Sequence, residues 1–70
     1  MLINGNMNLE FYGKTATHGF FEVLNKDGSS SGEWVVAWLP QFNGNKVSWA
    51  SGHYFYGDKK YAFEVFSRNI

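Results

Sequence analysis

The chain has 70 residues, with six basic and six acidic side chains, two histidines and no cysteine. The zero net charge excludes the strong electrostatic attraction that draws nucleic acid to a basic surface. The absence of cysteine excludes disulfides and thiolate zinc sites. A core of this size supplies only about 3–5 kcal/mol, so we expect one small domain, 1–70, that depends on its three Trp, four Tyr and seven Phe for packing.

The N-terminal segment Met1–Gly5 has no basic region, and no window reaches the ~18 apolar residues of a membrane span. We therefore expect a cytoplasmic protein without membrane contact.

Glycine-containing turn signals divide the chain into segments rich in aromatic and β-branched residues, a pattern typical of a small antiparallel sheet. The expected strands are Leu9–Lys14, Gly19–Asn25, Glu33–Phe42 and Lys46–Tyr56.

The strongest turn signal is Asn43-Gly44, which predicts a type I′ hairpin between the third and fourth strands. Counting outward from it pairs Trp38 with Trp49 and Trp34 with His53. All three tryptophans then share one face, which we expect to be the core.

The opposite face is apolar as well, and its expected members are Phe20, Leu24, Val35, Ala37, Leu39, Ala50, Tyr54 and Tyr56. Its extent depends on the first hairpin. If the turn at Asp27-Gly28 is tight, Phe21 lies opposite Trp34, whereas a longer loop through the following serines loses this register. A sheet that is apolar on both sides needs two covers, and one short helix provides only one.

The tail Asp58–Ile70 decides the architecture. As a helix it has Asp58 as N-cap and an apolar stripe on one side, made by Tyr61, Ala62, Val65, Phe66, Asn69 and Ile70. As a strand it would follow a hairpin loop at Gly57–Lys60. We expect an α+β fold, a four-stranded antiparallel meander with a C-terminal helix; the alternative is an all-β five-stranded small barrel.

The pattern Trp49-x-x-Gly52-His53-Tyr54-Phe55, followed by Ala62-x-x-x-Phe66, resembles small uncharacterised proteins on mobile elements of Gram-positive bacteria. In those proteins a strand is followed by a helix. The resemblance implies a helical tail and a phage or plasmid setting, and it implies no activity.

His53 is the strongest candidate for acid–base chemistry, because imidazole titrates near neutral pH. Its nearest expected partners are Ser51 and Glu33, but no Ser-His-Asp order or Gly-x-Ser-x-Gly elbow accompanies it. No histidine pair stands at the spacing of metal ligands, and His18 lies in a polar turn. We therefore expect no catalytic residue, no metal site and no cofactor.

Aromatic residues beyond the needs of one core, on a face without charge, are typical of protein interfaces. The sequence therefore favours a non-enzymatic protein–protein interaction module, a dimer or a partner-bound chain, with Tyr54, Tyr56, Phe20 and Leu39 as binding residues. The mobile-element resemblance extends this to an inhibitor of a bacterial host or defence protein. One alternative is a small β-barrel that binds single-stranded nucleic acid, which the neutral charge disfavours. The other is a carbohydrate-binding module.

Overall fold

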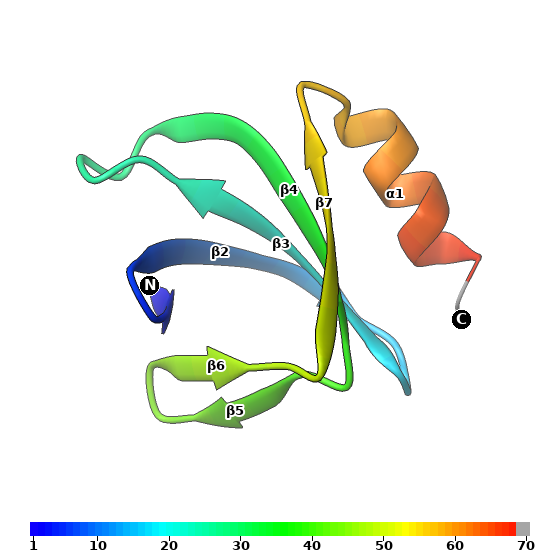
Figure 1. Ribbon diagram of the computed structural model, residues 1–70, viewed down its shortest axis with the longest axis horizontal. Coiled ribbons are helices and arrows are strands. Elements are labelled where there is room, and N and C mark those ends of the chain that lie inside the picture. Colours follow the sequence, from blue (N-terminus) through cyan, green and yellow to red (C-terminus); the bar gives the residue numbers. More distant parts are fainter. Residues whose placement is uncertain (69–70) are drawn as a thin grey trace.

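The structure is a computed structural model that describes residues 1–68 as one seven-stranded sheet and a C-terminal helix (Figure 1). The elements are β1 (Leu2–Asn4), β2 (Met7–Lys14), β3 (His18–Leu24), β4 (Ser30–Trp38), β5 (Gln41–Asn43), β6 (Lys46–Ser48), β7 (Ser51–Tyr56) and α1 (Lys59–Ser67). The order in the sheet is β5-β6-β1-β2-β3-β4-β7. Among the described strands, only β1 and β6 pair in parallel. The expected combination of a sheet with a helix holds, but the four-stranded meander does not.

Each of the last two expected strands is broken into two. Leu39 has φ 55° and ends β4; among the described residues it is the only non-glycine with positive φ. Pro40 follows it and has no N–H to donate to a ladder. Opposite this break, Trp49 and Ala50 separate β6 from β7. The long hairpin therefore bends, and its distal half, β5 and β6, turns away from β4 and β7.

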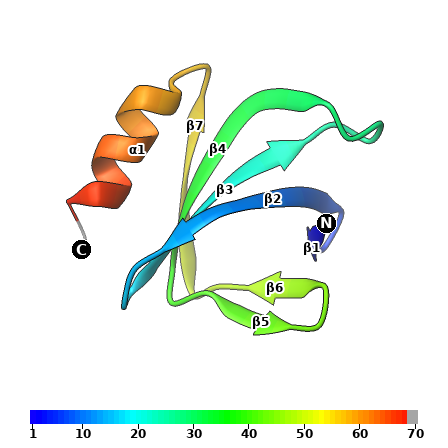
Figure 2. The same cartoon turned by 180° about the vertical axis from the view of Figure 1, so that it is seen from behind.

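The distal half of the hairpin pairs with β1, a strand that the sequence did not predict. Ile3 pairs with Lys46, and the Ile3 N–H donates to the Asn45 carbonyl at 2.8 Å. Because β4 continues into β5 and β6 into β7, this pairing curls the sheet back on itself. Figures 1 and 2 show β5 and β6 lying across the open side of the curved sheet. The sheet is therefore curled, as in the barrel alternative, and the chain also has the expected C-terminal helix.

The β5–β6 turn differs from the predicted type I′ hairpin. Asn43 pairs with Lys46, so the two-residue loop is Gly44-Asn45. Gly44 has φ 62° and occupies the first central position, where a type II′ turn takes glycine. The register moves by two residues, and Trp34 lies opposite Phe55, while Trp38 lies opposite Ser51 instead of Trp49.

The two sides of the sheet carry separate cores. The inner core lies within the curl and consists of Leu9, Phe21, Val23, Val35, Ala37 and Val47, with Leu2, Met7 and Trp49 packed against it. The outer core lies under α1 and consists of Phe20, Trp34, Val36, Ala62 and Phe66, with Phe55 and Val65 against it. The chain therefore forms a core on each of the two apolar sides of its sheet.

The prediction that the three tryptophans share one face was also wrong. Trp34 is buried in the outer core, while Trp49 belongs to the inner core with its ring centroid 5.6 Å from that of Phe21. Trp38 is exposed at the end of β4. Two features separate Trp49 from Trp38: the turn at Gly44-Asn45 sets Trp38 opposite Ser51, and the break at Trp49-Ala50 takes Trp49 out of the ladder.

The helical tail is confirmed over Lys59–Ser67. The Asp58 side chain accepts a hydrogen bond from the Tyr61 N–H at 3.1 Å, which makes it the expected N-cap. Two stripe residues, Asn69 and Ile70, lie outside the described residues.

Candidate functional site

Phe20, one of the four predicted binding residues, is not available to a partner. It is only 3% exposed, and it lies opposite Val36 under α1. The cause is an irregularity within β4. The turn itself is tight, since the Asn25 N–H donates to the Ser29 carbonyl at 2.9 Å and Leu24 pairs with Ser30, but the next pair is Val23 with Glu33, so Ser31 and Gly32 are extra residues in β4. The resulting one-residue change of register moves every β3 side chain to the other face relative to β4.

Tyr54 and Tyr56 lie together on β7 and are exposed, at 41% and 74% of their surface. Tyr54 is opposite Val35, on the inner side of the sheet, and Tyr56 is opposite Glu33. The charge of Glu33, together with a hydrogen bond to it, raises the pKa of Tyr56 above its ordinary value of 10.0. Leu39 is exposed too, but it follows Trp38, which pairs with the opposite end of β7. The structure therefore brings together two of the four predicted residues.

β7 is an edge strand whose only neighbour in the described sheet is β4. The Gly57 N–H donates to the Gly32 carbonyl at 2.8 Å, in the register that pairs Glu33 with Tyr56. In an antiparallel ladder the direction of the main-chain groups alternates from residue to residue. Ser51, His53 and Phe55 therefore direct their N–H and C=O groups at β4. Those of Gly52, Tyr54 and Tyr56 point outward, to the free edge.

Several features that block strand addition are missing from this edge. Proteins protect edge strands with charged side chains, proline, bulges, very short length or a covering helix or loop. Here α1 packs beside β7, where the Tyr61 ring centroid lies 5.4 Å from that of Phe55. The six residues of β7 include no charge and no proline, and their pairing with β4 runs without a register shift. The other edge, β5, has only three residues and follows Pro40. β7 is therefore the longer of the two edge strands of the described sheet.

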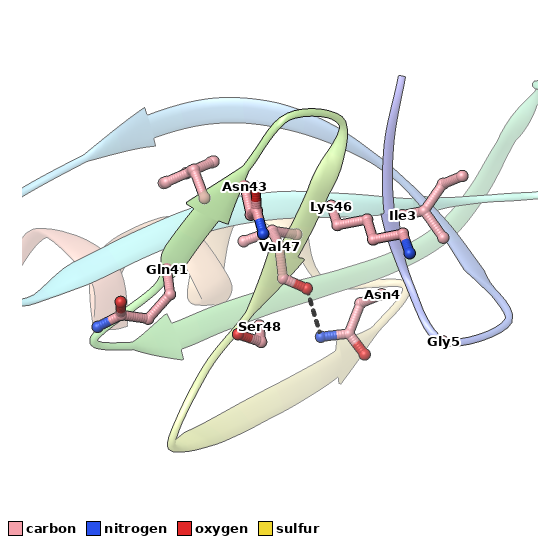
Figure 3. Close-up of a pocket in the computed structure, with 9 residues that line it drawn as sticks. Ile3, Asn4, Gly5, Gln41, Asn43, Lys46, Val47 and Ser48 are labelled. Atoms are coloured by element: carbon pink, nitrogen blue, oxygen red, sulfur yellow. Dashed lines mark hydrogen bonds between the residues drawn. The ribbon is translucent and has the colours of Figure 1, made fainter.

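A polar groove lies on the other side of the molecule, where β1 pairs with β6 (Figure 3). Its volume is about 710 Å³, and it is lined by Ile3, Asn4, Gly5, Gln41, Phe42, Asn43, Lys46, Val47 and Ser48. The Asn4 amide donates to the Val47 carbonyl at 3.0 Å, which ties the first turn to β6. The lining offers three carboxamides, a hydroxyl and one ammonium group, and no carboxylate.

The sequence prediction missed this groove, although a signal for it exists. The same triplet occurs twice, as Asn4-Gly5-Asn6 and Asn43-Gly44-Asn45, and both glycines adopt positive φ in a two-residue loop. The parallel pairing of β1 with β6 brings residues of both hairpins to one groove.

A third cluster surrounds the first turn of α1. The Lys59 ammonium lies 5.1 Å from the Trp34 ring centroid and 5.7 Å from that of Tyr12. Glu22, the only buried charged residue among those described, accepts hydrogen bonds from the Ser30 hydroxyl and from the Tyr12 hydroxyl at 3.4 Å. A hydrogen bond to Glu10 raises the pKa of Tyr12 above 10.0. The polar and charged groups of this cluster are paired with one another, so the cluster stabilises the junction of helix and sheet.

The histidines take different places from those expected. His53 lies opposite Val36 instead of Trp34 and is exposed. His18 begins β3 and is half-buried, with Nδ1 2.7 Å from the Thr17 hydroxyl. Within residues 1–68, no group of three or more His, Cys, Asp or Glu side chains is arranged to hold a metal ion. In the same part of the chain, no helix has the length and apolar character needed to span a membrane.

The comparisons with known proteins return nothing: no protein-family model, no curated protein and no solved structure matches the chain.

Proposed function

We propose that this chain is a non-enzymatic protein-interaction module that binds an extended segment of a partner protein by strand addition along β7. The observation that carries the proposal is the free edge of β7, which presents the main-chain groups of Gly52, Tyr54 and Tyr56 beside two exposed tyrosine rings. In strand addition, main-chain hydrogen bonds supply affinity and side chains supply specificity.

The tyrosines suit this role. Tyrosine is enriched at interfaces because its ring contributes a large contact area and its hydroxyl tolerates water. Tyr54 and Tyr56 are two residues apart and therefore project to the same side of β7. A bound strand would contact both rings. The resemblance to proteins of mobile elements makes a bacterial host or defence protein the first class of partner to test.

Affinity capture tests the proposal when it compares variants of the edge. The immobilised chain is exposed to a Gram-positive bacterial lysate, and retained proteins are identified for the natural chain, Tyr54→Pro and Tyr61→Ser. Tyr54→Pro removes one outward N–H without removing a bond to β4. Tyr61 is exposed to a similar degree, 46%, but lies on α1. We expect a protein that the natural chain and Tyr61→Ser retain and Tyr54→Pro loses. If Tyr54→Pro retains the same proteins as the natural chain, the proposal is contradicted.

Carbohydrate binding in the polar groove is a second candidate function. Carboxamides and a hydroxyl are suited to sugar hydroxyl groups, and the groove volume of about 710 Å³ lies within the range of ligand sites. Binding of oligosaccharides, followed by NMR shifts of the Gln41 and Asn43 amides, tests this candidate. Gln41→Ala should weaken binding. Shifts confined to β7 or α1, or no shifts at all, would contradict it.

A further inference from the structure

We infer that the β7 edge pairs with the β7 edge of a second copy of this chain, antiparallel and with Tyr54 on the two-fold axis. This inference rests on the proposed function, since it names one partner for the same edge. Its starting point is the direction of the main-chain groups on β7 and the absence of charge along that strand.

The three outward-facing residues define the register. In an antiparallel pair, residues that exchange hydrogen bonds recur at every second position. Placing Tyr54 opposite Tyr54 of the partner subunit sets Gly52 opposite Tyr56 of the partner subunit, and the reverse follows by symmetry. All three N–H groups and all three C=O groups of each edge are then used, which gives six hydrogen bonds between the two chains.

Other symmetric registers satisfy fewer groups. Centring the axis on Tyr56 carries the pairing past the end of β7 and places Asp58 opposite Tyr54 of the partner subunit. Centring it on Gly52 carries the pairing into the break at Trp49-Ala50. The register centred on Tyr54 is the one that keeps every paired residue inside β7.

The side chains and the charge are compatible with this pairing. A C₂ interface places the same surface on both copies, so any charge near the axis would face its like. β7 has none, and the whole chain has a net charge of zero. Gly52 has no room for a side chain, because an added Cβ would lie 2.9 Å from Nε1 of Trp49 and 3.4 Å from atoms of Tyr54 and Val35. The ring of the partner's Tyr56 would come to lie beside Trp49 and Tyr54.

Sedimentation equilibrium of the natural chain and a cysteine cross-link test the inference together. Residues that exchange hydrogen bonds in an antiparallel pair have Cα atoms about 5.5 Å apart, which is within the range that a disulfide spans. The chain has no cysteine of its own, so Tyr54→Cys introduces a single thiol. We expect a concentration-dependent dimer, and faster disulfide formation between copies of Tyr54→Cys than between copies of Tyr61→Cys, the exposed control on α1. Tyr54→Pro should remain folded and monomeric.

A natural chain that stays monomeric up to about millimolar concentration would overturn the inference. A dimer that Tyr54→Pro leaves intact, or equal cross-linking of both cysteine variants, would overturn it too. A labelled peptide with the sequence of residues 50–57 separates this failure from that of the proposed function. If it binds the natural chain and not Tyr54→Pro, the edge accepts strands and only self-pairing is wrong. If it does not bind, self-pairing is wrong, and strand addition as a whole fails only if the affinity capture also retains the same proteins with Tyr54→Pro.

Discussion

Phe20 lies opposite Val36 across β3 and β4, and its ring stacks between Trp34 and Phe66, with centroids 5.1 and 5.3 Å away. This places it at the centre of the outer core, between the sheet and α1. Phe20 is therefore one of several side chains, with Trp34, Val36 and Phe55, that attach the helix to the sheet.

Phe20→Ala should lower the free energy of unfolding by about 3–5 kcal/mol, because it leaves a cavity between α1 and the sheet. Urea denaturation followed by tryptophan fluorescence measures the loss. Phe63→Ala is the matched control, since Phe63 also contacts Phe20, at 5.9 Å, but is exposed. Equal losses for the two variants would contradict the assignment of Phe20 to the core.

The same pair of residues explains how far the sequence predicted the fold. The alternation within β3 and β4 was visible in the sequence, as were the helix and its cap at Asp58. The pairing register between neighbouring strands was not visible, because one or two extra residues in a turn or a bulge change it. The irregularity at Ser31 and Gly32 in β4 moved Phe20 from the predicted binding face into the core.

The bend at Leu39 could not be predicted for a different reason. A leucine rarely adopts positive φ, and only tertiary contacts hold it there. The Leu39 N–H donates to the Thr17 carbonyl at 2.7 Å, a contact between segments far apart in the sequence. The bend creates the β1–β6 pairing and the polar groove, so neither was predicted. The position of Tyr54 and Tyr56 on one side of β7 was predicted, because it depends on strand alternation alone.

Gly19→Ala should be strongly destabilising, by about 1–3 kcal/mol, because the site is already filled. An added Cβ would lie 2.7 Å from Cε1 of Phe21 and 3.1 Å from Cγ of Pro40. Gly13→Ala is the control, since its Cβ would meet Phe66 at an ordinary 3.8 Å, and it should be neutral or stabilising by up to about 1 kcal/mol. Thermal unfolding of both variants checks the difference, and the reverse order would show that the inner core is packed differently.

Asp58→Ala should cost about 1 kcal/mol, because it leaves the Tyr61 N–H without its cap. Asp58→Asn retains an acceptor and should keep most of the stability. Circular dichroism at 222 nm during urea titration reports both. The cap has no role in stability if the alanine and asparagine variants unfold at the same urea concentration.

The pKa of Tyr56 should fall toward 10.0 in Glu33→Gln, because the Glu33 charge is the main cause of its elevation. The folded chain favours the neutral phenol, so the associated stability is fully present below pH 10.0 and is lost as the pH rises through the raised pKa. NMR titration of the Tyr56 ring measures the change. Glu64→Gln, on α1 beside Arg68, should leave the titration of Tyr56 as it was.

Amide hydrogen exchange along β7 tests the central claim, that this edge is open for a partner strand. In dilute solution we expect fast exchange at Tyr54 and slow exchange at its neighbours His53 and Phe55, whose N–H groups point at β4. As the concentration rises, Tyr54 should become protected while His53 and Phe55 change little. Tyr54 exchanging as slowly as His53 at every concentration would show that the edge is already covered, and that result would contradict the claim.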